Sequence, residues 1–260
     1  MKLLISLVLS CSLFGHTDRW MQPTGSKPAL YIWKQDATDL IPLLSRLLPA
    51  DPAIVDAGAY LGYESRELAH LFPKGRIHSF EPVAQLYRQL ESNMSDLPNV
   101  STYRLALGDR CEERTMHLST APDWEPGKIS LSSSLLPPKD HLLYSDTQFE
   151  LSEIVQVTTL DQWAGDHEIQ KIDMLWLDMQ GYELPTLKAS PIILSTVSVI
   201  LTEVEFVEAY QGQSLYDEVR SWLESQGFAL VGGTFSFPKE RNQWFGDALF
   251  VRKELVEKLY

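Results

Sequence analysis

The chain has 260 residues and carries 35 acidic against 22 basic side chains, a formal net charge of −13. This charge repels phosphate backbones and anionic lipid headgroups, and no dense run of lysine or arginine offsets it, so nucleic acid is not an expected substrate. Hydrophobic residues make up 44% and charged residues 22% of the chain, which indicates a globular protein rather than a disordered chain or a membrane bundle.

The first residues differ in character from the rest of the chain. Lys2 is followed by an apolar run from Leu3 to Leu9, so residues 1–15 resemble a signal peptide. The run is too short for a stable membrane span, which needs about 20 apolar residues. A cleaved export signal and a buried or amphipathic N-terminal segment both fit, so the localisation stays open between export and cytoplasm. Residues 16–36 form a polar lead, and we expect a single domain over 37–260.

In the first part of this domain, helical and strand patterns alternate. Leucine and isoleucine at helical spacing predict a helix over residues 38–48. The pattern that follows is strand, helix, strand, helix and strand, over residues 53–55, 62–72, 76–80, 81–94 and 99–107. This is the order of βαβ units, which place parallel strands side by side in one sheet.

Residues 111–152 interrupt this alternation, because they are rich in serine, proline and turn residues. We predict that they form an insertion or a lid. A β-prone segment at 153–157 restores the pattern, and a helix, two strands, a helix and two strands follow at 159–163, 172–177, 197–204, 214–226, 228–231 and 248–252. The fold class is therefore α/β, a Rossmann-like doubly wound sheet, with any ligand at the carboxyl ends of the strands.

A glycine-containing turn follows the first predicted strand, where residues 56–62 read Asp-Ala-Gly-Ala-Tyr-Leu-Gly. The glycines permit a tight turn that brings backbone N–H groups close to a ligand. Glu81 ends the second strand nineteen residues after Gly62, the position from which a carboxylate accepts hydrogen bonds from ribose hydroxyls in this topology. Together they predict a nucleoside site. The alternatives are a plain strand-to-helix turn and, for Glu81, a solvated helix N-terminus.

The glycine count bears on which nucleoside binds. Dinucleotide-binding loops need three glycines at G-x-G-x-x-G spacing to admit a pyrophosphate, and this loop has only Gly58 and Gly62. S-adenosylmethionine has no pyrophosphate and carries a sulfonium cation, which suits an acidic loop. Gly108-Asp109, after the third predicted strand, could meet the adenine edge or form a simple turn. The expected cofactor-binding residues are Asp56, Gly58, Ala59, Tyr60, Gly62, Glu81, Gly108, Asp109 and Asp178.

Several segments in this order match one family. They are IVDAGAYLGY (54–63), FEP (80–82), ALGD (106–109), TLD (159–161), IDMLWLDMQGYE (172–183), TEVEF (202–206), YQGQ (210–213), GF (227–228) and GDALF (246–250). Over roughly residues 50–253 the chain resembles the FkbM-type class I methyltransferases. The resemblance implies a seven-stranded, mostly parallel sheet with an antiparallel last strand. It also implies methylation by S-adenosylmethionine, typically at a hydroxyl of a sugar, polyketide or similar small molecule.

One motif departs from the family pattern. The family commonly shows Lys-Ile-Asp-Val-Glu-Gly where this chain has Trp-Leu-Asp-Met-Gln-Gly at residues 176–181. Asp178 and Gly181 are retained, whereas Trp176 and Gln180 replace two side chains of opposite charge. The electrostatics near the acceptor are therefore expected to differ, and a subgroup substrate follows from that.

Methyl transfer to oxygen needs an aligned acceptor and the removal of one proton, for which a single carboxylate suffices. Asp178, at the end of the fourth parallel strand, is the first candidate base, and Glu203 is the second. Alternatively, Asp178 binds the cofactor's ammonium group or caps the following helix. The scattered histidines and the carboxylates show no ligand spacing that would predict a metal site.

Other functions remain open at this level. The signal-like start also suits an exported, non-enzymatic module that retains the fold and binds a glycan or another partner. An NAD-dependent oxidoreductase is permitted by the fold but disfavoured by the missing glycine. The favoured prediction is an enzyme that transfers a methyl group to a small-molecule or glycan acceptor.

Overall fold

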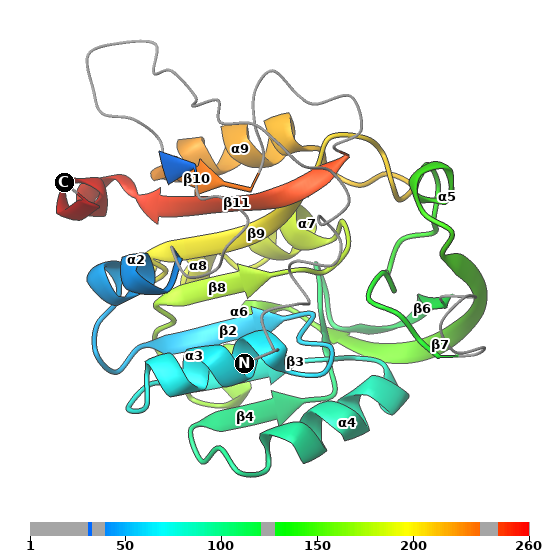
Figure 1. Cartoon of the computed structure of the whole chain (residues 1–260), viewed down its shortest axis with the longest axis horizontal. Helices are drawn as coiled ribbons and strands as arrows, with labels where there is room; N and C mark the ends of the chain where they lie inside the picture. The colour runs from blue at the N-terminus through cyan, green and yellow to red at the C-terminus, as the bar shows by residue number, and fades with distance from the viewer. Residues whose placement is uncertain (1–30, 33–39, 121–127, 235–243, 260) are drawn as a thin grey trace.

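The computed structural model describes residues 31–32, 40–120, 128–234 and 244–259 (Figure 1). The signal-like segment 1–15 and most of the lead 16–36 lie outside these residues. A central sheet of eight strands has the order β1-β10-β11-β9-β8-β2-β3-β4. In chain order its strands are β1 (Tyr31–Ile32), β2 (Ala53–Ala57), β3 (Arg76–Phe80), β4 (Val100–Tyr103), β8 (Met174–Leu177), β9 (Val199–Glu205), β10 (Phe228–Gly233) and β11 (Phe245–Arg252).

All neighbouring strands in this sheet are parallel except β11, which runs antiparallel to both β9 and β10. Apart from the two-residue strand β1 at its edge, the sheet is the predicted one, seven strands with the last antiparallel. Because β11 runs in the opposite direction, its first residues lie at the edge where the parallel strands end.

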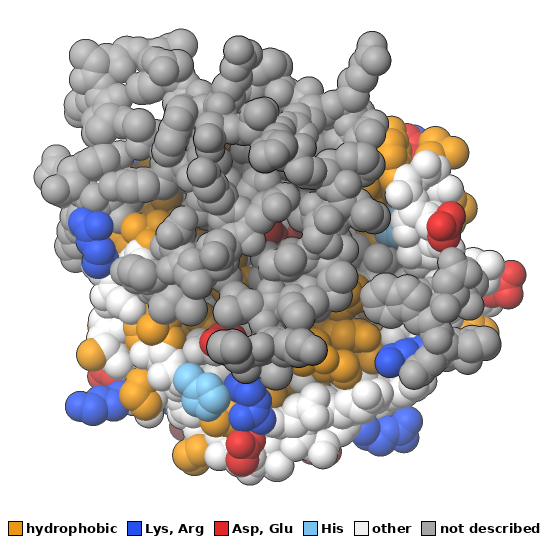
Figure 2. Space-filling model, viewed as in Figure 1, with side chains coloured by type: hydrophobic (Ala, Val, Ile, Leu, Met, Phe, Trp, Pro, Cys, Tyr) orange, Lys and Arg blue, Asp and Glu red, His pale blue; other side chains and the backbone are white. Residues whose placement is uncertain are grey.

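Helices cover both faces of the sheet (Figure 1). One face carries α2 (Leu40–Leu47), α3 (Tyr63–Leu71), α4 (Ala84–Met94) and the 3-10 helix η1 (Lys253–Leu259). The other face carries α6 (Leu160–Asp166), α7 (Glu183–Lys188), α8 (Pro191–Leu194) and α9 (Tyr216–Ser225). None of the helices within the described residues is long and apolar enough to cross a membrane. On the described part of the face in Figure 2, basic and acidic side chains lie interspersed with hydrophobic ones.

The strands are apolar on both sides because each side packs against helices. In β2, Ile54 joins the core under α2 and α3, whereas its neighbour Val55 joins the core under α6 to α9. Met174 and Leu175 of β8 divide in the same way. This alternation holds the central strands rigidly, so the residues that follow their carboxyl ends have fixed positions.

The prediction of one continuous strand over residues 99–107 is wrong. Residues 99–107 form two short strands in different sheets, β4 in the central sheet and β5 (Ala106–Leu107) in a second one. The second sheet has the order β5-β7-β6, where β6 (Glu112–Thr120) and β7 (Gln148–Thr158) form an antiparallel hairpin. The chain changes sheets because β5 pairs with β7, some fifty residues away in the sequence, a partner that local patterning does not reveal.

The segment 111–152 thus contains regular structure. It includes β6, the short helix α5 (His141–Tyr144) and the first part of β7. The hairpin lies beside the carboxyl-terminal edge of the central sheet in Figure 1. Its inner face packs on Val83, Leu86 and Tyr182, so it is attached to the domain through a hydrophobic cluster of its own.

Candidate functional site

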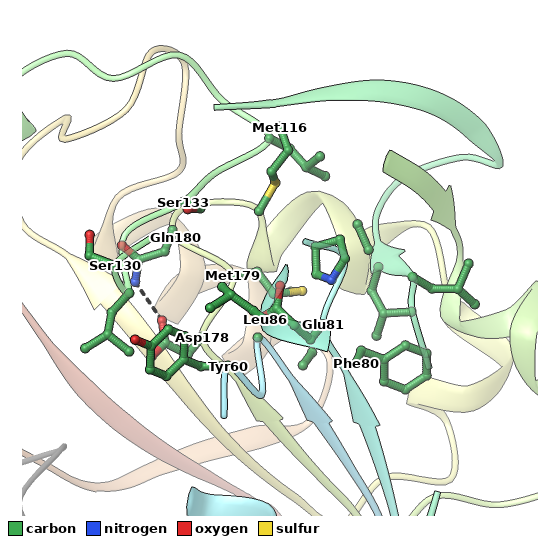
Figure 3. Close-up of a pocket in the computed structure, with 18 residues that line it drawn as sticks. Tyr60, Phe80, Glu81, Leu86, Met116, Ser130, Ser133, Asp178, Met179 and Gln180 are labelled. Carbon is green, nitrogen blue, oxygen red and sulfur yellow. Dashed lines mark hydrogen bonds between the residues drawn. The ribbon is translucent and has the colours of Figure 1, made fainter. Parts of the chain in front are cut away.

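A cavity lies between the carboxyl-terminal edge of the central sheet and the β6–β7 hairpin (Figure 3). The space between its lining atoms amounts to about 620 Å³, a figure that includes the part open to solvent. Its lining comes from the loop after β2, the end of β3, the loop after β8, strand β5 and the turn 130–135. Polar lining residues include Tyr60, Glu81, Ser130, Ser133, Asp178 and Gln180.

The loop after β2 reaches over the ends of two neighbouring strands. The backbone N–H groups of Gly58 and Ala59 both donate to the Phe80 carbonyl, at 3.1 and 2.9 Å. Gly58 has a φ of +86°, and a Cβ at this position would lie 1.8 Å from the Asp178 carbonyl oxygen. Only glycine permits this close approach, so Gly58 sets the distance between the two loops at the cavity floor.

Three other predicted residues of this turn lie behind the cavity lining. Asp56 is buried and accepts a hydrogen bond from the Ser65 hydroxyl of α3. Gly62 has a φ of +85°, and a Cβ there would lie 2.7 Å from both Leu90 Cδ1 and Met94 Cε on α4. Ala59 is fully buried against the same helix. These residues hold the loop in place, while Gly58 and Tyr60 face the cavity.

Glu81 lines the cavity at the end of β3, as its spacing from Gly62 predicted. It is 5% exposed, and one carboxylate oxygen accepts from the Val83 N–H at 2.8 Å. Burial raises its pKa to about 8, although the backbone hydrogen bonds from Val83 and Tyr60 oppose this shift. A buried carboxylate beside a cavity gains stability from donors on a ligand, and ribose hydroxyls are such donors.

Gly108 and Asp109 follow β5 and lie outside the cavity lining. The Asp109 carboxylate accepts from the Tyr182 hydroxyl at 2.8 Å and from Arg110 at 2.9 Å. Arg114 of β6 donates to the same Tyr182 hydroxyl and stacks over its ring, 4.7 Å from the centroid. In this structure Asp109 therefore connects the hairpin to the loop after β8.

Acidic side chains meet where β8, β9 and β11 reach the site. Leu177 pairs with Thr202 in parallel register, so the next residues, Asp178 and Glu203, are neighbours. Asp247, near the start of the antiparallel β11, pairs with Glu203. Asp178 follows a parallel strand and Glu203 lies near the end of another, whereas Asp247 reaches the same edge only because its strand runs the other way.

Burial raises the pKa of the carboxyl groups in this row and of those behind it. The pKa of Asp56 and of Asp247 rises to about 7, and that of Glu64 to about 8. Asp178 is exposed to the cavity, but the protein around its carboxyl removes enough solvent to raise its pKa. The pKa of Glu203 rises well above its usual range because burial and the neighbouring Asp178 charge act together. Among the described residues, no lysine or arginine forms an ion pair with them.

Comparison with known proteins identifies the family. The family model described as the methyltransferase FkbM domain matches residues 56–230, which is more than half of the chain and includes most of the cavity lining. This chain belongs to the FkbM methyltransferase family. The resemblance that the motifs indicated is confirmed.

Two curated relatives support this assignment. The 2-O-methyltransferase NoeI of Sinorhizobium fredii is 30% identical over 198 residues, which cover 76% of this chain and 79% of NoeI. The methyltransferase sdnD of Sordaria araneosa is 26% identical over 242 residues, which cover 84% and 86% of the two chains.

A solved structure agrees in fold. The FkbM methyltransferase of Methylobacillus flagellatus superimposes with a TM-score of 0.50 at 14% identity, over 80% of this chain and 45% of that one. The present chain therefore spans less than half of that protein. The likeness extends to the Rossmann-like fold of class I methyltransferases.

This FkbM methyltransferase is an S-adenosylmethionine-dependent enzyme, and the residues at its cavity fit that cofactor. Glu81 offers a buried carboxylate to ribose hydroxyls, while Phe80, Leu86 and Leu107 offer apolar surface. The carboxylate row suits a sulfonium cation, since the described residues provide it with no ion pair. Among the residues described, no group of His, Cys, Asp or Glu side chains could hold a metal ion.

Gln180 was not among the catalytic or cofactor-binding residues predicted from the sequence, but it belongs to the site. Its side-chain Nε2 donates to Asp178 Oδ1 and to Glu203 Oε2, both at 2.7 Å, and it lines the cavity beside Asp178 (Figure 3). The sequence marked Gln180 as a departure from the family pattern. The hydrogen bonds that it makes depend on the packing of β8, β9 and the hairpin.

The two positions at which this chain departs from the family motif, Trp176 and Gln180, replace a lysine and a glutamate, whose charges are opposite. Trp176 is partly buried and packs on the core under α2 and α3, on the sheet face that also carries Asp56. A lysine there would place a cation near the carboxylate row, and a glutamate at 180 would add an anion. Trp176 and Gln180 together keep the net charge of the site unchanged while removing both ions.

Proposed function

We propose that this methyltransferase transfers a methyl group to a hydroxyl of a small molecule or a sugar, with Asp178 as the general base. The observation that supports this most directly is the position of Asp178. Its carboxylate lies at the cavity lining, directly after β8 and in contact with Gln180. The similarity to a protein named 2-O-methyltransferase points to oxygen as the methylated atom.

The cofactor, when bound, supplies an electrophilic methyl group on a sulfonium. The residues of this chain then have two tasks, which are alignment of the acceptor oxygen and removal of its proton. We assign cofactor binding to Gly58, Tyr60 and Glu81 on the cavity lining, with Asp56, Ala59 and Gly62 holding the loop and Gly108 and Asp109 supporting the opposite side. The proton of the acceptor hydroxyl passes to Asp178, whose pKa is raised by burial and thus better matched to a base at neutral pH.

The cavity also indicates the charge of the acceptor. Its described lining contains the carboxylates Glu81 and Asp178 and no lysine or arginine, and Glu203 lies directly behind Gln180. A phosphate or carboxylate on the acceptor would find no cationic side chain in this lining and would lie beside acidic groups, which disfavours its binding. The proposed acceptor is therefore an uncharged or cationic molecule that presents hydroxyl groups.

The experiment is a transfer assay with methyl-labelled S-adenosylmethionine. Neutral saccharides, an amino sugar, aliphatic alcohols and phenols are offered together with phosphorylated and carboxylated sugars, and products are located by mass spectrometry and NMR. We expect label on a hydroxyl of a neutral or cationic compound. Label on nitrogen or carbon alone, or preference for the anionic sugars, would contradict the proposal.

A further inference from the structure

The side chain and backbone of Gln180 are held from several directions. The Nε2 group contacts Asp178 and Glu203, as described above, and the side-chain oxygen lies 2.7 Å from the Tyr210 hydroxyl. The backbone carbonyl accepts from the Ser134 hydroxyl at 2.7 Å. Gln180 has a φ of +55°, an uncommon value for a residue other than glycine. Each of its hydrogen-bonding side-chain atoms thus has a defined partner.

These contacts favour one orientation of the amide when the single proton of the Tyr210 hydroxyl is donated to Gln180 Oε1 and not to the Ser132 carbonyl. Tyr210 is fully buried, and its hydroxyl is 2.7 Å from Gln180 Oε1 and 2.9 Å from the Ser132 carbonyl. A hydroxyl that donates to Oε1 leaves Nε2 directed at the two carboxylates, where its N–H groups can serve both. The reversed amide would place an oxygen against Asp178 Oδ1 and would leave an ionised Asp178 carboxylate without this donor.

We propose that Gln180 is a positioning residue that holds Asp178 and Glu203 in their reactive arrangement and keeps Asp178 ionisable, with Tyr210 fixing the orientation of its amide. This inference rests on the proposed function only for its catalytic consequence. The neutral amide donates to the charged form of Asp178 without adding charge of its own. An amide donor stabilises the carboxylate, and so opposes the effect of burial on its pKa.

Asp178 is surrounded by acidic groups, so its ionisation depends strongly on whether residue 180 is neutral or negatively charged. The ionisable groups that interact with it from β2, α3, α7, β9 and β11 are the carboxyls of Asp56, Glu64, Glu183, Glu203, Glu205 and Asp247. Tyr210 also faces this group, and its own pKa is raised well above the usual range, mainly by burial. A further anion at 180 would therefore add to an existing excess of negative charge.

The test exchanges the amide for an isosteric carboxylate. In the full chain, Gln180→Glu removes the donor to Asp178 and adds a charge beside it, so the pKa of Asp178 rises. Selective ¹³C labelling of aspartate carboxyls follows this pKa by NMR, with the Asp178 signal identified by its absence in Asp178→Asn. We expect its titration midpoint to move upward by about one pH unit or more.

The catalytic consequence has its own measurement. With an acceptor that the parent methylates, we expect kcat of Gln180→Glu at pH 7 to fall by about tenfold or more. The KM of the acceptor and the Kd of S-adenosylmethionine should change little. Because the base titrates later, kcat should recover as the pH is raised, which a structural defect would not produce. Tyr210→Phe should shift the titration in the same direction by a smaller amount.

Matched controls exist elsewhere in the chain. Gln156 is exposed on β7, and its Nε2 donates to Glu113 at 2.7 Å, so Gln156→Glu makes the same chemical change outside the cavity. Tyr87→Phe removes a hydroxyl that contacts Glu91 on α4. Both controls should leave the Asp178 titration and kcat unchanged.

Two results would overturn the inference. One is an Asp178 midpoint in Gln180→Glu equal to that of the parent. The other is a kcat for Gln180→Glu equal to that of the parent at every pH. Absence of methyl transfer to any hydroxyl by the parent would instead contradict the proposed function, while the titration would still decide the role of Gln180.

Discussion

The two walls of the cavity are built in different ways. One wall, which we call the glycine-loop wall, is formed by residues 57–62 and 80–82. It is held together largely by backbone hydrogen bonds between the ends of the adjacent strands β2 and β3. The serine-turn wall, residues 130–135 and 178–183, is held by side chains from distant parts of the chain, including the Ser134 hydroxyl on the Gln180 carbonyl. The first wall therefore tolerates little change in backbone geometry, whereas the second depends on particular hydroxyl, amide and carboxyl groups.

The largest effect should follow from changing the backbone of the glycine-loop wall. In Gly58→Ala the new Cβ overlaps the Asp178 carbonyl oxygen, and the left-handed φ adds about 1–2 kcal/mol of strain. The loop must move to relieve this overlap, and a shift of that kind costs roughly 100-fold or more in function. We expect loss of S-adenosylmethionine binding in calorimetric titration and a lower Tm.

A second glycine provides the control for this change. Gly165 lies in α6, and an added Cβ there meets no atom within 4 Å. Gly165→Ala should bind the cofactor as the parent does and be more stable by about 0.5–1 kcal/mol. Normal cofactor binding by Gly58→Ala would show that the two loops do not need their close approach.

The next largest effect concerns one carboxylate of the serine-turn wall. Asp178→Asn removes the proposed base while nearly preserving shape, so kcat should fall by about 10² to 10⁴-fold. The Kd of S-adenosylmethionine should stay within about threefold, since we assign its binding mainly to the other wall. Steady-state kinetics with calorimetry measure both quantities. A larger loss of binding than of kcat would place Asp178 with the cofactor instead.

A smaller effect is expected from the carboxylate of the glycine-loop wall. Glu81→Gln removes a carboxylate that ionises when it accepts from ribose hydroxyls, a loss of about 1.5–3 kcal/mol, which corresponds to a Kd roughly 10- to 100-fold weaker. The exposed Glu67 on α3 supplies the control variant Glu67→Gln. If the two variants bind S-adenosylmethionine equally well, the ribose assignment of Glu81 is wrong.

The last effect concerns stability instead of function, and it is the dependence of cofactor-free stability on pH. The folded-state pKa of Asp56 and Asp247 is raised to about 7, and that of Glu64 and Glu81 to about 8. Because each folded pKa exceeds the unfolded value near 4, their contribution to stability is complete below about pH 4 and is lost as the pH rises toward 8.

We therefore expect the Tm of the cofactor-free protein to fall between pH 5 and pH 8, by more than about 5 °C because each unit of pKa shift corresponds to about 1.4 kcal/mol. Glu81→Gln should flatten this dependence, because it removes one of the groups that titrate in that window. Differential scanning calorimetry across the pH range measures both slopes. A Tm that rises over this range would show that the buried carboxyls are paired in solution.

The contrast between the walls also explains what the sequence could predict. Residues 56–62 and Glu81 belong to adjacent βα units, so their proximity follows from the fold class alone. Apart from the strand at 99–107, which divides between two sheets, the predicted strands and helices of the domain were recovered because the hydrophobic pattern is local. Glu81 reaches the cavity, and Gly58 has the positive φ that the turn required.

The serine-turn wall could not be predicted in this way. The contacts of Ser134 with Gln180, and of Tyr210 with Ser132 and Gln180, join residues 30 to 78 positions apart. The split of residues 99–107 between two sheets has a similar origin, because β5 pairs with a strand about fifty residues later. Such contacts arise from tertiary packing, which periodicity does not encode.

The hydrogen bonds of the turn at residues 130–135 also bear on how substrate enters the cavity and how product leaves it. Movement of residues 132–134 away from Gln180 would break the bonds to Ser134 and Tyr210 together, and would leave their buried polar atoms without partners. Exchange of substrate and product is therefore expected to occur past a stationary turn. Turnover in such an arrangement needs no gating step at this turn, so the chemical step can set kcat.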